Sequence, residues 1–415
     1  MPKLAVRGGE PLYKGTDFRQ TWPIVGKADV NALARVAAGG DWWRYVPNSE
    51  VERFEKEYAA YHDAKHCLAV SNGTVAIVTA LKALGVEPGD EVIVPAMTFI
   101  ASASGVILAN AVPVFADCDP ETYQLSAESV EQHVTRRTVG VLPVHYAGYP
   151  CDLDALRRVA RKHGLFIMED SSHAQGTEWR GRKVGAIGSA GSFSFQQSKS
   201  LTSGEGGAVV TDDASLYEKA YAHHHIGRTL WAEQYEHTTV GPNYRLTEFQ
   251  GAVLRTQLRK LPRQTEVKMR NVAALWKELK GIPGLAPLKP DRRITRRGYY
   301  FVVLRHSQEK MSGVPRGRFL EAVRAEGAPV GAGYRHPVYR IPVFREGSFG
   351  RKGCPINCRH YGKQMDYSKV HLPVVERACD HEQLTIAHQY FMYRENVRRF
   401  ARVFAKVCEN LAELG

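Results

Sequence analysis

Short apolar stretches alternate with helical patterns between residues 67 and 211, and this alternation limits the possible folds more than any other feature of the sequence. The strand-like stretches are 67–71, 91–94, 112–117, 139–145, 165–170, 191–195 and 207–211. The helix-like stretches between them include 74–84, 99–110, 126–135 and 152–163. Strands that alternate with helices favour a mostly parallel sheet with helices on both faces. The sequence therefore predicts an α/β fold.

The pattern changes outside this region, and a chain of 415 residues is long enough for a large and a small domain. We expect residues 1–40 to form an N-terminal arm and an entry helix. We expect residues 41–280 to form the large domain, which ends in a long helical stretch over 244–280 that is interrupted at Pro262. After a boundary at 281–284, residues 285–415 predict a small C-terminal α+β domain. Its expected elements are a strand at 299–304 and helices at 317–326 and 381–413.

Lys199 stands between the strand-like stretch 191–195 and the glycine-rich turn Gly204-Glu-Gly-Gly207. A partly desolvated lysine can exist as a free amine near neutral pH and form a Schiff base with an aldehyde. The aldehyde that this context indicates is pyridoxal 5′-phosphate (PLP). The alternative is an ordinary surface lysine. PLP also needs an acid for its ring nitrogen, a cradle for its phosphate and a side chain that stacks on the ring.

Each of these needs has a candidate at the end of a predicted strand. Asp170 ends the apolar stretch 165–170, at the edge where open α/β sheets bind ligands, and can keep the ring nitrogen protonated. Gly73 and Thr74 lie in a small-residue turn that starts a helix, where free N–H groups can bind phosphate. Phe99 follows another strand and can stack on the ring. The alternatives are a turn cap for Asp170, an ordinary N-cap for the turn, and core packing for Phe99.

Together these segments resemble the DegT-type sugar aminotransferases, a family of fold-type I PLP enzymes. The resemblance covers most of the chain, from Asp41 to about Gln257, with a weaker match to the end. Its motifs are Ser71-Asn-Gly-Thr74, Pro143-Val-His145, Glu169-Asp170, Phe193-Ser-Phe195, Lys199, Gly204-Glu-Gly-Gly207 and Asn243-Tyr-Arg245.

The resemblance implies a role for each matching position. Lys199 corresponds to the catalytic lysine that holds PLP as a Schiff base, and Asp170 to the partner of the ring nitrogen. His173 corresponds to a residue that contacts the ring or its phenolic oxygen. Ser194 corresponds to a phosphate ligand that acts with Gly73 and Thr74. The cofactor is therefore expected to be PLP.

Asn243 matches a family position that reaches the phosphate of the neighbouring subunit. This match implies a homodimer with shared active sites, in agreement with the general prevalence of two-fold dimers.

Within the family, Asp41-Trp-Trp-Arg44, Thr202-Ser-Gly-Glu-Gly-Gly207 and Cys354-Pro355 resemble two subgroups, the scyllo-inosose aminotransferases and the 3-amino-5-hydroxybenzoate synthases. The first implies amino transfer from glutamine or glutamate to a keto-cyclitol or keto-sugar, in the biosynthesis of aminocyclitol or amino-sugar antibiotics. The second implies a PLP-dependent dehydratase and aromatase. A non-catalytic regulatory protein on the same fold is a further alternative. Ser171-Ser172 departs from the usual Ala-Ala of the family and leaves the acceptor open.

Three residues are candidates for substrate binding. Arg44 can pair with the carboxylate of the amino donor in a bidentate contact, or it can form a structural ion pair. Tyr334 and His336, in Gly333-Tyr-Arg-His-Pro337, are parallel candidates from the small domain.

Composition narrows the remaining classes. The formal net charge is +13, but the basic residues are scattered, so nucleic acid is not the expected partner. The sequence has neither an apolar run long enough to span a membrane nor an apolar leader, so the expected location is the cytoplasm. The seven cysteines are widely spaced and odd in number, which favours reduced thiols. Cys354, Cys358 and His360 lack a second half-site, so a metal is not expected.

Overall fold

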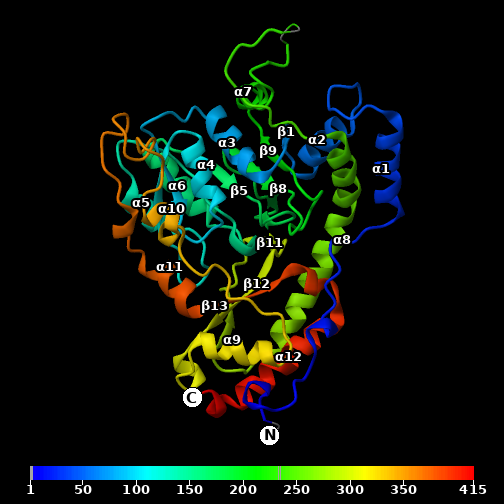
Figure 1. Cartoon of the computed structure of the whole chain (residues 1–415), viewed down its shortest axis with the longest axis vertical. Helices are drawn as coiled ribbons and strands as arrows, with labels where there is room; N and C mark the ends of the chain where they lie inside the picture. The colour runs from blue at the N-terminus through cyan, green and yellow to red at the C-terminus, as the bar shows by residue number, and fades with distance from the viewer. Residues whose placement is uncertain (1–2, 232, 234) are drawn as a thin grey trace.

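A seven-stranded sheet with the strand order β1-β9-β8-β5-β4-β2-β3 forms the centre of the larger part of the molecule (Figure 1). The computed structural model describes residues 3–231, 233 and 235–415. β9 runs antiparallel to both of its neighbours, and the other pairs are parallel. The predicted α/β fold is confirmed, and the seven predicted stretches correspond to the strands β1 (His66–Val70), β2 (Glu91–Pro95), β3 (Val112–Ala116), β4 (Thr138–Val141), β5 (Phe166–Asp170), β8 (Ala190–Ser194) and β9 (Gly207–Thr211).

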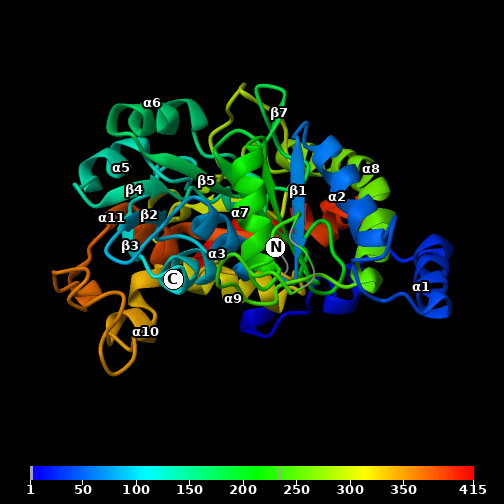
Figure 2. The same ribbon diagram turned by 90° about the horizontal axis from the view of Figure 1, so that it is seen from above.

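Successive side chains of these strands point to opposite faces of the sheet and enter different hydrophobic clusters. Leu68 and Met168 pack on the face of α3 and α4, whereas Cys67 and Ile167 pack on the face of α2, α6 and α8. Figure 2 shows α5 and α6 on one side of the sheet and α10 on the other. The helices of this domain are α2 (Glu50–Tyr61), α3 (Gly73–Ala83), α4 (Ala101–Leu108), α5 (Ala127–His133), α6 (Leu153–His163) and α7 (Ala214–His224).

The long helix α8 (Glu248–Glu278) joins the two parts of the molecule (Figure 1). Its first half packs beside α1 (Lys27–Gly39) and α2, and its second half beside α12 (Arg394–Glu409). The predicted interruption at Pro262 is wrong, because the helix continues through the proline. A proline inside a helix costs roughly 3 kcal/mol. Burial of Leu258 and Leu261 beside it offsets that loss.

The smaller part of the molecule is built on an antiparallel sheet of β10 (Leu285–Pro287), β12 (Phe301–His306) and β13 (Gln383–Ala387). It is covered by α9 (Arg316–Ala325) and α12. Leu4 and Phe18 of the N-terminal arm belong to the same core, so the two ends of the chain lie together (Figure 1). The sequence predicts one helix over 381–413, but residues 383–387 of this range form β13. The buried, β-branched Thr385 and Ile386 pair there with β12.

Residues 338–378 leave the small domain and pack on the large one. This segment contains α10 (Pro342–Arg345) and α11 (Pro373–Arg377). The hydroxyl of Tyr361 donates to Glu91 at 2.8 Å, and that of Tyr367 donates to the carbonyl of Pro113 at 2.8 Å. The predicted small domain, 285–415, therefore contains a segment whose hydrophobic side chains belong to the core of the large domain.

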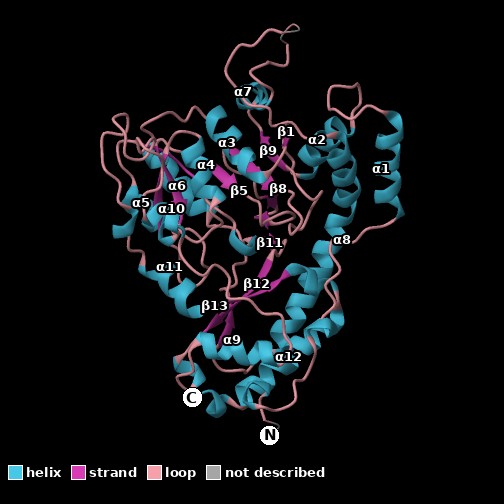
Figure 3. Cartoon of the chain, in the orientation of Figure 1, coloured by secondary structure: helices cyan, strands magenta, loops and turns pink. Residues whose placement is uncertain are grey.

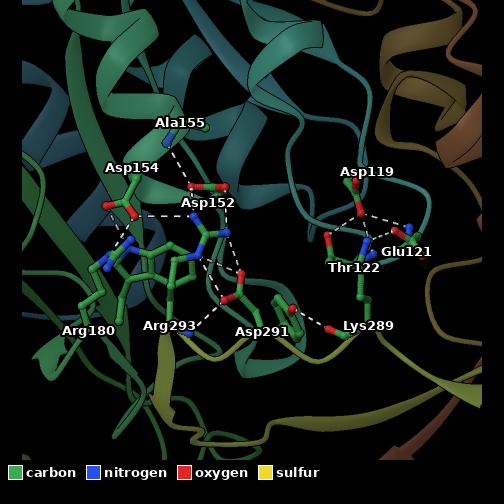
Figure 4. A network of polar contacts seen from close by, with 12 residues as sticks. Asp119, Glu121, Thr122, Asp152, Asp154, Ala155, Arg180, Lys289, Asp291 and Arg293 are labelled. Carbon is green, nitrogen blue, oxygen red and sulfur yellow. Dashed lines mark hydrogen bonds and ion pairs between the residues drawn. The ribbon is translucent and has the colours of Figure 1, made fainter.

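A second connection between the two parts lies in the segment between β10 and β12. β11 (Ile294–Arg296) pairs with β6 (Glu178–Trp179), which pairs with β7 (Arg182–Lys183). Beside this small sheet, Figure 4 shows the Arg293 guanidinium between three carboxylates. The nitrogen–oxygen distances are 2.6 Å to Asp291, 2.9 Å to Asp152 and 3.5 Å to Asp154. The network fixes the segment between β10 and β12 against the start of α6.

The loop between α7 and α8 projects from the end of the large domain (Figure 3). Its described exposed side chains include Leu230, Trp231 and Val240. Among the described residues, no helix has both the length and the apolar character that a membrane crossing requires.

Candidate active site

The carboxyl ends of β1, β2, β5 and β8 meet at one edge of the central sheet, where a cavity of about 800 Å³ opens. This is where open α/β sheets place their ligands. The small domain closes the cavity from the other side with residues of β12 and of the segment that follows α9. The polar and aromatic residues that line it include Asn72, Gly73, Thr74, Thr98, Phe99, Ser102, Asp170, His173, Ser194, Lys199, Tyr300 and Tyr334.

Lys199 follows β8 and lines the cavity with a half-buried side chain. Its Nζ lies 4.5 Å from the centroid of the Tyr300 ring. Burial lowers the pKa of Lys199 to about 8, and the nearby Asp170 carboxylate opposes part of this shift. An amine with this pKa is partly unprotonated near neutral pH and can act as a nucleophile.

Asp170 ends β5 and is buried at the bottom of the cavity. Its Oδ2 accepts a hydrogen bond from the Ser102 hydroxyl at 2.8 Å, and its Oδ1 accepts one from the Ser172 N–H at 3.1 Å. Ser102 is within 2.8 Å of the Thr98 hydroxyl, which fixes its orientation. A carboxylate has about four acceptor positions. Asp170 therefore retains the capacity to accept a bond from a ligand.

Glu169 precedes Asp170 on β5 and points to the opposite face of the sheet. Its carboxylate is fully buried and lies 2.9 Å from Nε2 of His145. It also accepts N–H bonds from Gly185 at 2.8 Å, Ile187 at 2.8 Å and Gly188 at 2.6 Å. All of its acceptor positions are used by the protein, so Glu169 is a structural residue of the sheet.

The start of α3 provides N–H groups beside Ser194. Asn72 caps the helix, because its Oδ1 accepts the Val75 N–H at 3.0 Å. Gly73 allows the close approach of the helix to β8, since a Cβ at this position would fall 2.6 Å from the Cβ of Ser194. The first turn of α3, including Thr74, therefore presents backbone donors and a positive dipole end to the same corner of the cavity as the Ser194 hydroxyl.

His173 and Tyr300 form a stacked pair on the wall of the cavity. Their ring centroids are 4.0 Å apart, with an angle of 27° between the planes. Burial, with a smaller effect from the Lys199 charge, holds the pKa of His173 well below its ordinary value, so the ring is neutral. The Tyr300 hydroxyl lies 2.8 Å from the Ser198 hydroxyl. Tyr300 was missed by sequence reasoning, which took 299–304 only as a strand.

Phe99 and Tyr334 also line the cavity. Phe99 is 59% exposed, so it does not belong to the core and offers a free ring face. Tyr334 is half-buried, with its ring centroid 5.5 Å from that of Tyr146. The structure thus brings Gly73, Thr74, Phe99, Asp170, His173, Ser194, Lys199 and Tyr334 around one cavity.

The expectation that Arg44 pairs with a donor carboxylate is wrong. The Arg44 guanidinium is buried and lies 2.9 Å from the Glu55 carboxylate and 3.1 Å from Nε2 of His224. The Glu55 carboxylate also accepts the Ala69 N–H at 2.7 Å. Burial of both charges makes this a structural ion pair, because neither group can turn to a ligand without leaving its partner uncompensated.

His336 is also misplaced by the prediction. Its side chain is exposed and faces a separate hollow, which Arg340 and Asp380 also line. It is not among the described residues that line the cavity of Lys199. Pro337 redirects the chain between Tyr334, which points inward, and the buried Val338.

Asn243 lies at the end of the projecting loop, and its side chain is exposed. It is not one of the described residues that line the cavity in the same chain. Residues 225 and 243 are paired as a short antiparallel bridge. The Arg245 guanidinium contacts Nδ1 of His225 at 3.1 Å, which supports this bridge. Its reach into a neighbouring subunit stays a prediction.

Comparison with known proteins gives consistent results. The model of the DegT/DnrJ/EryC1/StrS aminotransferase family matches residues 23–391. The L-glutamine:2-deoxy-scyllo-inosose aminotransferase of Streptoalloteichus tenebrarius is 36% identical over 432 residues, which cover 99% of each chain. The 3-amino-5-hydroxybenzoate synthase of Amycolatopsis mediterranei is 41% identical over 330 residues, which cover 78% of this chain and 83% of the relative. A crystal structure of a 3-amino-5-hydroxybenzoic acid synthase matches with a TM-score of 0.84 and 34% identity, over 96% of this chain and 99% of the other.

Proposed function

Because the chain belongs to the DegT/DnrJ/EryC1/StrS aminotransferase family, we propose that it transfers an amino group from L-glutamine or L-glutamate to a keto-cyclitol or keto-sugar with PLP as its cofactor. One observation carries this proposal. The Lys199 amine, whose pKa is lowered to about 8, shares one cavity with the Asp170 carboxylate and the start of α3. Aminotransfer needs these three groups together.

The residues of the cavity fit PLP. Asp170 retains acceptor capacity at the cavity floor, as a pyridinium N–H requires. Gly73, Thr74 and Ser194 supply N–H and hydroxyl donors for a phosphate, and a Cβ at position 73 would fill the space between them. The exposed ring of Phe99 is available for stacking.

Bound PLP supplies an aldehyde carbon for a covalent bond to an amine and a protonated ring that withdraws electrons. The protein contributes the remaining functions. Lys199 Nζ would hold the aldehyde, with loss of water, and after the amino donor has taken its place the freed amine would accept a proton from the α-carbon of the donor and deliver it again. Asp170 would hold the proton on the ring nitrogen. The stacked His173 and Tyr300 rings form the wall of the cavity beside Lys199, with the Tyr300 ring centroid 4.5 Å from its Nζ.

The proposed substrate class is that of the Streptoalloteichus tenebrarius aminotransferase, whose alignment covers 99% of each chain. Its name gives L-glutamine as donor and 2-deoxy-scyllo-inosose as acceptor. A PLP-dependent dehydratase and aromatase of the 3-amino-5-hydroxybenzoate synthase type is the second candidate. It is supported by the 41% identity to such an enzyme, which covers a smaller share of this chain. We place the product in aminocyclitol or amino-sugar antibiotic biosynthesis.

We further propose that the enzyme is a homodimer in which Asn243 of each chain reaches the phosphate site of the other. This proposal is supported by the position of the Asn243 side chain, which is exposed at the end of a projecting loop. Among the described residues, it does not line the cavity of the same chain. Mixing Lys199→Ala and Asn243→Ala chains is expected to restore activity, because hybrid dimers contain one site with both residues intact. Verified hybrids without activity would place Asn243 in its own site.

The cytoplasm is the proposed place of action. All seven cysteines are free thiols, as a reducing compartment allows. Four of them, Cys67, Cys118, Cys151 and Cys379, are buried.

The reaction class is tested with PLP-loaded enzyme and two donors, L-glutamine and L-glutamate, against keto-cyclitols, nucleotide keto-sugars and an aminodehydroshikimate-type ring. Amino transfer to a ketone with ping-pong kinetics is the expected result. Aromatisation of the ring without amino transfer would favour the second candidate instead. Inactivity toward every pair, with PLP bound, would contradict both.

A further inference from the structure

A second lysine, Lys268, is completely buried in the middle of α8, next to the segment that carries Lys199. Its Nζ donates hydrogen bonds to the Ser200 hydroxyl at 2.9 Å, to the Gly298 carbonyl at 2.6 Å and to the Tyr299 carbonyl at 3.2 Å. These acceptors come from two separate segments of the chain. The ammonium group therefore joins the segment after β8 to the segment before β12.

The acceptors of Lys268 are sequence neighbours of cavity residues. Ser200 directly follows Lys199, and Tyr299 directly precedes Tyr300. Two further bonds hold the same stretch: His388 Nε2 lies 2.9 Å from the Ser198 carbonyl, and Trp22 Nε1 donates to the Lys199 carbonyl at 3.1 Å. Residues 198–200 are thus held one after another by side chains from outside the cavity.

A buried lysine without a carboxylate partner is costly and needs a reason. Within the described part of the chain, the polar contacts of the Lys268 ammonium are these three uncharged oxygens. Burial lowers the pKa of Lys268 to about 7. A neutral amine has two N–H donors and an ammonium group has three, so three acceptors favour the charged form. An apolar residue would fill this position more cheaply if packing were its only role.

The titratable groups around this joint are few. On the side of Lys268, His388 is held neutral, because burial and the Lys268 charge keep its pKa well below the ordinary value. On the cavity side, Lys199 is faced by Asp170, His173 and Tyr300. The Lys268 hydrogen bonds therefore affect Lys199 by fixing the positions of two chain segments. The negative charge near Lys199 comes from Asp170.

We propose that Lys268 is a positioning residue of the aminotransferase, which ties residues 198–200 to residues 298–300 so that the Lys199 amine stays half-buried against the Tyr300 ring. The inference rests on the proposed function only for its consequence in catalysis. The structural claim concerns the Lys199 amine in the protein alone. Without the Lys268 contacts, the two segments are joined more weakly, by the Ser198–Tyr300 hydroxyl contact at 2.8 Å and by the long bonds of the Ser200 hydroxyl to the Gly298 and Tyr299 carbonyls at 3.5 and 3.3 Å. The segments can then move apart and admit water to the Lys199 amine.

The test is the titration of the Lys199 amine in cofactor-free protein. The protein is labelled with acetic anhydride over a series of pH values, and the extent of acetylation of Lys199 is read by peptide mass spectrometry. The wild-type amine is expected to titrate near its lowered pKa of about 8. In Lys268→Met, the pKa of Lys199 is expected to rise by about one unit or more, because water reaches the amine. Ser200→Ala, which removes one acceptor, is expected to give a smaller rise in the same direction.

Lys406→Met is the matched control. Lys406 is also a buried lysine, with Nζ 2.8 Å from the Glu326 carboxylate and 3.0 Å from the Glu10 carbonyl, in the core of the small domain. This variant is expected to lose stability and keep the wild-type titration of Lys199. An unchanged Lys199 pKa in folded Lys268→Met overturns the proposal, and so does an equal shift in Lys406→Met.

If Lys268→Met does not fold, Ser200→Ala decides by the same criterion, and a wild-type titration in that variant overturns the proposal. The measurement needs neither PLP nor substrate. Failure of the amino-transfer assay would therefore contradict the proposed function and leave this result standing.

Discussion

Glu169 and Asp170 are consecutive residues at the end of one strand, yet they face opposite sides of the sheet and differ in how their carboxylates are bonded. Glu169 receives its donors from His145 and from three backbone N–H groups. Asp170 receives two and opens on the cavity. A buried acid whose bonds are all made within the protein stabilises the fold, whereas one with a free acceptor position is available to a ligand.

The comparison predicts that substitution of Asp170 lowers activity, whereas substitution of Glu169 lowers stability. Asp170→Asn is expected to reduce kcat at least about a thousandfold, because a neutral amide cannot stabilise the protonated ring of PLP. Its thermal unfolding should remain close to that of the wild type, since the amide can still accept the Ser102 bond. Steady-state kinetics and a melting curve measure the two quantities. A near-normal kcat would mean that another residue holds the ring nitrogen.

Glu169→Gln is expected to show the reverse pattern. An amide NH2 cannot accept the N–H bonds that the carboxylate accepts, and leaving a buried donor without an acceptor costs about 1–3 kcal/mol, so the midpoint of chemical unfolding should fall. Protein that stays folded should retain most of its kcat, because the Glu169 side chain points away from the cavity. A variant of wild-type stability with low activity would show that the roles of the two acids are interchanged.

The stabilisation by Glu169 is expected to depend on pH. Burial alone would raise the pKa of Glu169, but the bond from His145 and the N–H groups of Gly185 and Gly188 lower it below 4.5. Its stabilising contribution is therefore complete above pH 4.5 and is lost as the pH falls through the depressed pKa. The difference in unfolding midpoint between wild type and Glu169→Gln should shrink in acid. A constant difference down to low pH would contradict this account.

A smaller effect is expected at the proposed phosphate site, where the start of α3 lies beside Ser194. Gly73→Ala places a Cβ 2.6 Å from the Cβ of Ser194, and such overpacking costs about 1–3 kcal/mol. The affinity for PLP should therefore fall by about tenfold or more in a fluorescence titration. Gly39→Ala, at the end of α1 with open space around it, is the matched control and should bind PLP normally. Equal affinities in both variants would move the phosphate site away from α3.

The cavity floor could be predicted from the sequence because its residues follow local patterns. Short continuous apolar stretches, each ended by a polar residue or a small-residue turn, locate Asp170 and Thr74 at strand ends, whereas the role of Ser194 came from the family resemblance. Parallel strands then bring these ends to one edge of the sheet. Lys199 was found in the same way, from the turn after β8.

The other side of the cavity depends on contacts between residues distant in sequence, which local patterns do not report. Tyr300 lies beside Lys199 because β12 returns from the small domain, and Lys268 reaches both segments from a helix that reads as plain amphipathic sequence. The surroundings of Arg44 and His336 depend on such contacts as well. Glu55 engages Arg44 in the structural ion pair that the sequence left as its alternative role, and the path of the chain around Pro337 turns His336 outward.

The central claim is that Lys199 is the lysine that bonds PLP, and reduction with borohydride tests it most directly. Wild-type protein, Lys199→Ala and Lys268→Met are incubated with PLP and reduced, and the labelled peptide is identified by mass spectrometry. The account predicts one reduced PLP adduct on Lys199 in the wild type and in folded Lys268→Met, and none at any single site in Lys199→Ala. A specific adduct on another lysine of the wild type, or the same adduct pattern in Lys199→Ala, would contradict it.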